Sequence, residues 1–185
     1  MHYSLAESNW GEEEIEAIRR VIDSDRFTMG KKVEAFESAY AKKFGTKYAV
    51  MTSSGSSANL VGLASFFFKR ENPLKRGDEV IVPSISWATT YYPLQQYGLK
   101  LKFLDIELDT LNIDVSKLEE ALTPKTKMVV AVSILGNPCS IEVIRNFCDK
   151  YGLYLLEDNC ESMGAELNGK LCGTFGDIGT FSTFF

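Results

Sequence analysis

Short apolar segments alternate with helix-length segments along most of this chain. Runs such as DEVIVPS, KMVVAVSIL and LYLLED are nearly continuous in valine, isoleucine and leucine, and a helix-length segment follows most of them. Continuous apolar strands are typical of parallel sheets that are buried on both faces, and parallel neighbours need long connections between them. The alternation therefore predicts an α/β fold with three layers, in which helices cover both faces of a mostly parallel sheet.

The pattern locates the individual elements. Two amphipathic surface helices are expected first, at residues 11–25 and 31–45, with Gly45 as the C-terminal stop of the second. Strands are then expected at residues 47–53, 78–84, 100–106, 127–135, 153–158 and 179–185. Helices are expected between them at residues 56–70, 87–98, 114–124 and 140–152. No linker or repeat divides the chain, and its last apolar strand has no polar tail, which suggests a fragment of a larger domain.

Charge and cysteine content narrow the possible partners. The formal net charge is −5, which disfavours a nucleic-acid surface, since such surfaces are basic. The longest apolar run, LVGLASFFF, is shorter than the roughly 20 residues that span a bilayer, so we expect a cytoplasmic protein that binds no membrane. Four widely spaced cysteines and a single histidine, His2, fit neither a metal site nor a disulfide framework, and we expect reduced, mostly buried thiols.

Serine and glycine gather where the helix at 56–70 should begin. Ser54, Gly55, Ser56 and Ser57 follow an apolar run directly. Ligands of parallel α/β sheets bind at the carboxyl ends of the strands, and the N-terminus of a helix attracts anions. The stretch fits a phosphate site, although a serine N-cap with a turn glycine would give the same letters.

Three further positions follow predicted strands. Trp87 comes after the strand at 78–84, where it would either cover a planar ligand or pack in the core. Asp158 ends an apolar strand and Glu161 follows it, and a buried carboxylate needs a partner such as a protonated ring nitrogen. Ser182 offers a hydroxyl at the end of the last strand. These residues together suggest a site for a phosphorylated, aromatic, nitrogen-containing ligand.

Several longer blocks resemble a known family. SSGSSANL, GDEVIVPSISWATTYYPLQQYG, LDIELDTLNID, LGNP, LEDNCESMGA and GTFGDIGTFSTFF are similar to the sugar aminotransferases and dehydratases of the DegT/DnrJ/EryC1/StrS family, which act on nucleotide-linked keto sugars. The resemblance runs nearly end to end. It implies the aspartate-aminotransferase-like fold (fold type I) with pyridoxal or pyridoxamine 5′-phosphate (PLP or PMP) as cofactor. Residues 1–185 would then be the N-terminal part of the PLP-binding large domain, without the rest of that domain or the small domain.

The resemblance also implies roles for individual residues. Asp158 would pair with the pyridinium nitrogen and Trp87 would stack on the ring, so that the ring can act as an electron sink. Gly55, Ser56, Ser57 and Ser182 would hold the phosphate. Phe27 and Met29, in DRFTMG, match a segment that lines the sugar-nucleotide site, although apolar residues after a helix also serve packing.

Glu161 departs from the aminotransferases of the family, which place glutamine or histidine there. A carboxylate beside the ring's phenolate would be repulsive unless the two share a proton. Such a pair is useful in an enzyme that has no lysine iminium, so Glu161 favours the dehydratase branch of the family. The alternative is that Glu161 is a solvated loop residue without a role in the site. The catalytic base, a lysine in aminotransferases and a histidine in the dehydratase, is expected just beyond Phe185.

The resemblance therefore implies removal of the C3 hydroxyl from a nucleotide-linked 4-keto-6-deoxy sugar. Such a reaction makes 3,6-dideoxy sugars for O-antigen and lipopolysaccharide. L-Glutamate would be the amino donor, and the protein would be a homodimer. Two alternatives stay open from the sequence: a nucleotide-sugar aminotransferase, which shares every site residue except Glu161 and the base, and a non-catalytic α/β fragment.

Overall fold

The computed structural model describes residues 10–183, which form two compact units. The first unit comprises residues 10–51 and the second residues 52–183. The sequence-predicted site residues fall mainly in the second unit, and only Phe27 and Met29 belong to the first.

The first unit consists of two helices. Helix α1 spans Glu12–Asp23, and its start is fixed by the Glu14 carboxylate, which accepts a 2.7 Å hydrogen bond from the Gly11 N–H. Helix α2 spans Lys31–Phe44 and ends at Gly45, whose φ of 65° is the left-handed conformation that glycine tolerates. Both helices and the glycine stop agree with the sequence pattern.

The second unit is built on a parallel sheet. Its five strands lie in the order β2-β1-β3-β4-β7, and every neighbouring pair is parallel. The strands are β1 (Glu79–Pro83), β2 (Lys100–Leu104), β3 (Thr126–Val132), β4 (Tyr154–Asp158) and β7 (Ile178–Thr180). In the register, Val132 pairs with Asp158 and Asp158 with Thr180, so these three residues lie side by side at the carboxyl edge.

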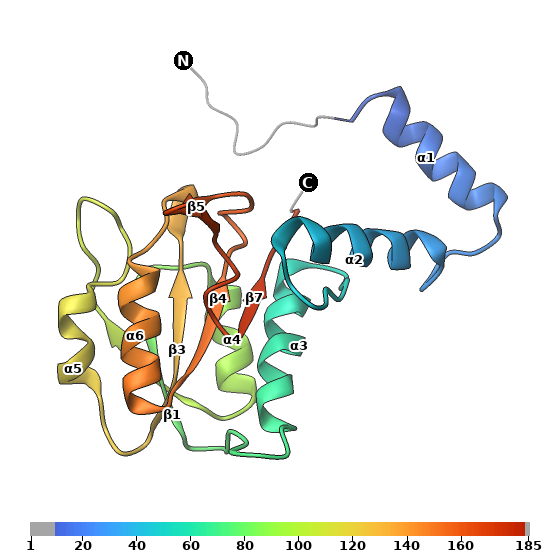
Figure 1. Cartoon of the computed structure of the whole chain (residues 1–185). Coiled ribbons are helices and arrows are strands. Elements are labelled where there is room, and N and C mark those ends of the chain that lie inside the picture. Colours follow the sequence, from blue (N-terminus) through green and yellow to red (C-terminus); the bar gives the residue numbers. More distant parts are fainter. Residues whose placement is uncertain (1–9, 184–185) are drawn as a thin grey trace. The chain divides into compact units, whose positions relative to one another are not determined.

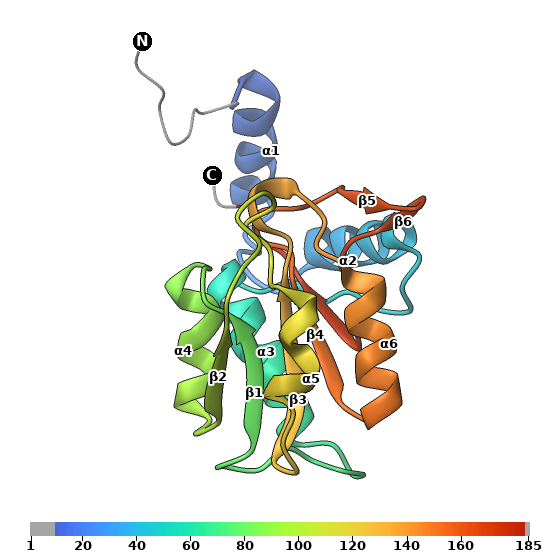
Figure 2. The ribbon, with the colours of Figure 1, turned by 90° about the vertical axis from the view of Figure 1, so that its left-hand side faces the viewer.

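Helices cover both faces of this sheet, as Figures 1 and 2 show. Helices α3 (Gly55–Phe67) and α4 (Ala88–Gln96) lie on one face, whereas α5 (Leu118–Ala121) and α6 (Ile141–Tyr151) lie on the other. Alternate strand residues enter the two cores: Val80 and Val130 pack with the α3 side, and Ile81 and Val129 with the α6 side. Successive side chains of a strand point to opposite faces, so a doubly covered strand must be apolar throughout. The predicted three-layer α/β fold is confirmed.

Three of the expected elements differ from the structure. The expected strand at 47–53 is not a strand: within residues 10–183 it pairs with no neighbour, and Tyr48 and Val50 are exposed. A strand exists only through hydrogen bonds to a neighbour, so an apolar sequence cannot make one alone. The expected helix at 114–124 is short, being a 3₁₀ turn at Val115–Lys117 followed by α5.

The last strand is also shorter than its sequence suggested. Strand β7 ends at Thr180, so Ser182 lies beyond it, and the last two residues of the expected strand lie outside the described part of the chain. A small antiparallel hairpin, β5 (Glu166–Leu167) and β6 (Lys170–Leu171), occupies the segment between β4 and β7.

The structure also bears on the expectations about membrane-spanning segments and cysteines. Among residues 10–183, no helix combines the length and the apolar character needed to cross a membrane. The four cysteines are free thiols; Cys139, Cys148 and Cys172 are buried, and Cys160 is partly buried.

Candidate functional site

Ser54 to Ser57 form the start of helix α3. Ser54 is the N-cap, and its hydroxyl accepts a 3.1 Å hydrogen bond from the Ser57 N–H. The Ser57 hydroxyl lies 3.0 Å from that of Ser53 and 3.1 Å from that of Ser54. The N-cap alternative is therefore correct for Ser54. It is compatible with an anion site, because the first N–H groups of a helix have no partners within the helix and carry its positive dipole end.

Gly55 brings three segments together at this point. A Cβ atom on Gly55 would lie 2.7 Å from the Cβ of Ser182 and 2.8 Å from the Sγ of Cys160. The start of α3, the residue after β7 and the loop after β4 are thus in close contact. A side chain at position 55 would separate them. Gly55 and Ser182, two of the predicted phosphate contacts, lie next to each other.

Asp158 lies at the end of the central strand β4 and is only 4% exposed. Its Oδ2 accepts hydrogen bonds from the Asn59 amide, at 2.9 Å, and from the Thr90 hydroxyl, at 2.8 Å. Its Oδ1 accepts a 3.2 Å bond from the Cys160 N–H. These donors are all neutral, and among the described residues no lysine or arginine pairs with Asp158. A buried carboxylate without a cation suits a positively charged ligand group.

Trp87 immediately precedes α4, one of the two helices whose side chains bond Asp158. It is the N-cap of α4, and its carbonyl accepts the N–H of Thr90, the residue whose side chain bonds Asp158. One helical turn thus joins the tryptophan to the contacts of the aspartate. Trp87 is 64% exposed, so it is not a core residue. Its ring is available to a ligand.

Glu161 is exposed and bonds across to the neighbouring loop. Its Oε2 accepts a 2.8 Å hydrogen bond from the N–H of Leu135, which follows β3 in the LGNP block. Leu135 has a φ of 52°, an unfavourable conformation for a branched residue. Glu161 is therefore more than a solvated loop acid: it joins the segments that follow two adjacent strands.

Glu157 differs from its neighbour Asp158. It is 2% exposed, and its carboxylate accepts the N–H groups of Gly173 at 2.8 Å and Phe175 at 2.7 Å, together with that of Gly176. Burial raises the pKa of this carboxyl group, and the three backbone N–H donors act in the opposite direction. Glu157 faces the loop that leads into β7. It therefore holds that loop, and no ligand contact is needed to explain its burial.

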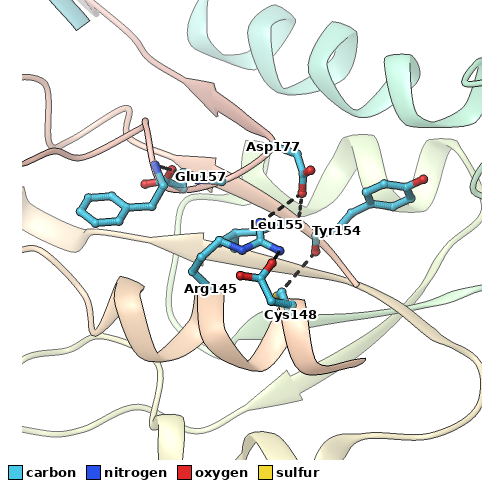
Figure 3. Close-up of polar contacts among 9 residues, drawn as sticks. Arg145, Cys148, Tyr154, Leu155, Glu157 and Asp177 are labelled. Carbon is cyan, nitrogen blue, oxygen red and sulfur yellow. Dashed lines mark hydrogen bonds and ion pairs between the residues drawn. The ribbon is translucent and has the colours of Figure 1, made fainter. Parts of the chain in front are cut away.

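A second polar cluster holds the same loop from the side of α6. Asp177 accepts a 2.8 Å hydrogen bond from the Leu155 N–H and forms a 3.4 Å ion pair with Arg145, as Figure 3 shows. Since Leu155 belongs to β4 and Asp177 precedes β7, these bonds fix the two strands against each other.

The predicted substrate contacts belong to the first unit. Phe27 is 67% exposed and Met29 is 84% exposed, with a φ of 42° at Met29. Both side chains are thus surface residues of that unit. Their role in binding a sugar nucleotide stays a prediction.

Sequence reasoning missed Asn59, Thr90 and Thr180. The Thr180 hydroxyl donates a 2.5 Å hydrogen bond to Oδ1 of Asn59, which in turn donates to Asp158. One signal was available: Asn59 is a polar residue in the otherwise apolar part of helix α3, where an amide needs a buried partner.

Comparisons with known proteins identify relatives that match this chain along its whole length. Residues 8–185 match the DegT/DnrJ/EryC1/StrS aminotransferase family. The whole chain is 55% identical to the GDP-4-keto-6-deoxy-D-mannose 3-dehydratase of Yersinia pseudotuberculosis, and covers 47% of that protein. The chain thus spans about half the length of the curated relatives it matches.

Two solved structures are similar over the full chain. The Escherichia coli GDP-4-keto-6-deoxy-D-mannose 3-dehydratase with bound hydrated PLP has a TM-score of 0.94 and 54% identity, and the chain covers 47% of it. A GDP-4-keto-6-deoxymannose 3-dehydratase with a trapped PLP-glutamate geminal diamine has a TM-score of 0.95 and 54% identity, with 48% of it covered.

Proposed function

This chain belongs to the DegT/DnrJ/EryC1/StrS aminotransferase family, and we propose that it is part of a PLP/PMP-dependent GDP-4-keto-6-deoxy-D-mannose 3-dehydratase. The observation that carries the proposal is the 55% identity over all 185 residues with the Yersinia enzyme of that name. The enzyme would remove the C3 hydroxyl of its substrate and supply 3,6-dideoxy sugars such as colitose for O-antigen.

The residues at the carboxyl edge fit the cofactor. Asp158 is a buried carboxylate that still has acceptor capacity and has no cation beside it among the described residues. Gly55 lets the start of α3 approach Ser182 so closely that a Cβ would clash there, at a helix N-terminus suited to phosphate. We therefore assign Asp158 to the ring nitrogen, Trp87 to the ring face, and Gly55, Ser56, Ser57 and Ser182 to the phosphate.

The protein's own groups then have distinct tasks. When bound, the cofactor supplies an electron sink next to the sugar's C4 carbon. Asp158 would keep the ring nitrogen protonated, and Glu161 would hold a proton at the ring's hydroxyl oxygen. A histidine beyond Phe185 would move protons near neutral pH without attaching to the cofactor covalently. We retain Phe27 and Met29 as contacts of the sugar nucleotide.

The overall reaction balances with glutamate as the co-reactant. The sugar loses the oxygen at C3 and gains two electrons, while glutamate is oxidised to its 2-keto acid and releases its nitrogen as ammonia. We propose a homodimer as the active form. Sedimentation of the intact protein tests the dimer separately from the chemistry.

The decisive experiment uses the intact protein with PLP, L-glutamate and GDP-4-keto-6-deoxy-D-mannose. We expect ammonia and a sugar product that lacks one oxygen. An amino sugar without released ammonia would instead identify a nucleotide-sugar aminotransferase. Failure to acquire a cofactor absorbance band would favour a non-catalytic protein.

Borohydride treatment of the PLP-loaded protein gives a second, independent test. A lysine that held the cofactor as a Schiff base would be fixed as a stable mass adduct. We expect no adduct, because the dehydratase proposal places histidine at that position. A covalent adduct together with an amino sugar would move the assignment to the aminotransferase.

A further inference from the structure

A buried chain of polar side chains lies beneath the candidate site. Thr180 donates to Asn59 at 2.5 Å, and Asn59 donates to Asp158 at 2.9 Å. On the other side, Ser86 and Thr90 lie 2.8 Å apart, and Thr90 donates to Asp158 at 2.8 Å. Asn59, Thr90 and Thr180 are each at most 4% exposed, so their bonds do not compete with water.

Asn59, Thr90 and Thr180 each lie close in sequence to a proposed cofactor contact. Asn59 lies in α3, close to Ser56 and Ser57, and Thr90 lies one turn after Trp87 in α4. Thr180 ends β7, two residues before Ser182. The network therefore connects the supports of the phosphate, the ring face and the ring nitrogen through one carboxylate.

The network allows one orientation of the Asn59 amide. An ionised carboxylate only accepts hydrogen bonds, so the amide nitrogen must face Asp158 and the amide oxygen must face the other way. The Thr180 hydroxyl then donates to that oxygen. Thr180 thus fixes Asn59, and Asn59 fixes Asp158, although Thr180 does not contact the carboxylate.

The hydrogen bonds also distinguish the two oxygens of Asp158. Oδ2 accepts from both Asn59 and Thr90, which occupies its acceptor capacity. Oδ1 accepts the Cys160 N–H, and that bond is longer, at 3.2 Å. Oδ1 is therefore the oxygen that would accept a ring N–H. The two donors on Oδ2 prevent the carboxylate from rotating away from that direction.

We propose that Asn59 and Thr90 are positioning residues that aim Oδ1 of Asp158 at the ring nitrogen of PLP, and that Thr180 acts on this geometry through Asn59. The inference rests on the proposed function, because it requires PLP at this site. It predicts that the network controls the protonation of the ring nitrogen, not only the stability of the fold.

Other titratable groups near Asp158 should not obscure this effect. Burial, and next the charge of Asp158 and its contact with the thiol, raise the pKa of Cys160, so the thiol stays protonated at neutral pH. Burial also raises the pKa of Tyr91. Glu161 faces the neighbouring loop through Leu135 and is unchanged in the variants below.

The experiment measures the ring nitrogen directly. The intact protein is loaded with PLP labelled with ¹⁵N in the ring, and the ¹⁵N chemical shift is followed against pH. Thr90→Val removes the donor at constant shape, and Thr90→Ser is the matched control that keeps it. We expect the apparent pKa of the pyridinium to fall by about one unit, a tenfold change in protonation, in Thr90→Val, and to stay at the wild-type value in Thr90→Ser.

Thr180→Val keeps the test decisive if Thr90→Val does not fold. It leaves both direct donors to Asp158 in place. We therefore expect the apparent pKa of the pyridinium to fall, but by less than in Thr90→Val. A merely structural role would lower the melting temperature and leave the ring nitrogen titration unchanged; that result, with PLP bound, would overturn the inference. A wild-type protein that binds no PLP would overturn the proposed function as well, and so the two failures differ.

Discussion

Gly55 and Ser182 meet at the carboxyl edge of the sheet, where a Cβ atom on Gly55 would come within 2.7 Å of the Cβ of Ser182. Carbon atoms that are not bonded normally stay about 3.5–4.0 Å apart, so only glycine permits this contact. The first residue of α3 can therefore lie against the segment that follows β7. The proposed phosphate site depends on this approach.

Replacing Gly55 by alanine should push α3 and Ser182 apart. We expect the intact Gly55→Ala protein to bind PLP at least about tenfold more weakly and to lose roughly 1–3 kcal/mol of unfolding free energy through overpacking. Titration of the cofactor absorbance and urea unfolding measure the two effects. Gly11→Ala is the control, because Gly11 also lies at the start of a helix and the nearest atom to a Cβ there would be Glu14 Oε2, at 3.6 Å. Equal PLP affinities in the two variants would contradict the assignment of this site to phosphate.

Asp158→Asn should separate chemistry from stability. The amide oxygen must face Asn59 and Thr90, so the amide NH₂ would point at the Cys160 N–H and the ring nitrogen. The ring nitrogen cannot then stay protonated, and we expect kcat to fall by on the order of a hundredfold. Asp149→Asn, an exposed change in α6, serves as the control in the same turnover and urea assays. Near-normal turnover of Asp158→Asn with bound cofactor would refute the role.

Glu161→Gln tests the shared proton at the ring oxygen. A carboxylate beside the ring hydroxyl disfavours the phenolate, so a neutral side chain should lower the pKa of that hydroxyl. We expect the pH midpoint of the bound cofactor's absorbance change to move downward in the intact Glu161→Gln protein. Glutamine can still accept the Leu135 N–H, which keeps the loop contact in place. An unchanged midpoint would mean that Glu161 serves the Leu135 turn and not the cofactor.

The buried thiols predict a loss of stability at alkaline pH. Burial raises the pKa of Cys139 and of Cys148 from an ordinary value of 9.0 to about 12. A raised pKa in the folded state means that the contribution to stability is complete below about pH 9 and is lost as the pH rises towards 12. We therefore expect the urea midpoint to fall as the pH rises from about 9 towards 12. The Cys139→Ala/Cys148→Ala protein should show a shallower fall, and identical slopes would count against this explanation.

The sequence alone determined the architecture and the edge at which the site lies. Strands that pack under helices on both faces must be apolar along their length, so β1, β3 and β4 stand out in the sequence. Parallel strands end at one edge, so the sequence predicts that Trp87, Asp158 and Ser182 lie near that edge. The prediction of a strand at 47–53 was wrong for a related reason. Composition shows that a segment can form a strand, but it does not show whether another strand lies beside it.

Only the tertiary structure decided which side chains support the site. Asn59 is a polar residue within an apolar part of α3, but no local pattern distinguishes Thr90 and Thr180 from surface residues. Their importance comes from contacts made across distant parts of the sequence, with Asn59 and Thr90 both reaching Oδ2 of Asp158. Likewise, Glu157 and Asp158 are adjacent acids at a strand end, yet they point to opposite faces and find different partners. Hydrogen bonds between side chains depend on distances that the fold sets, and such distances are not encoded in spacing along the chain.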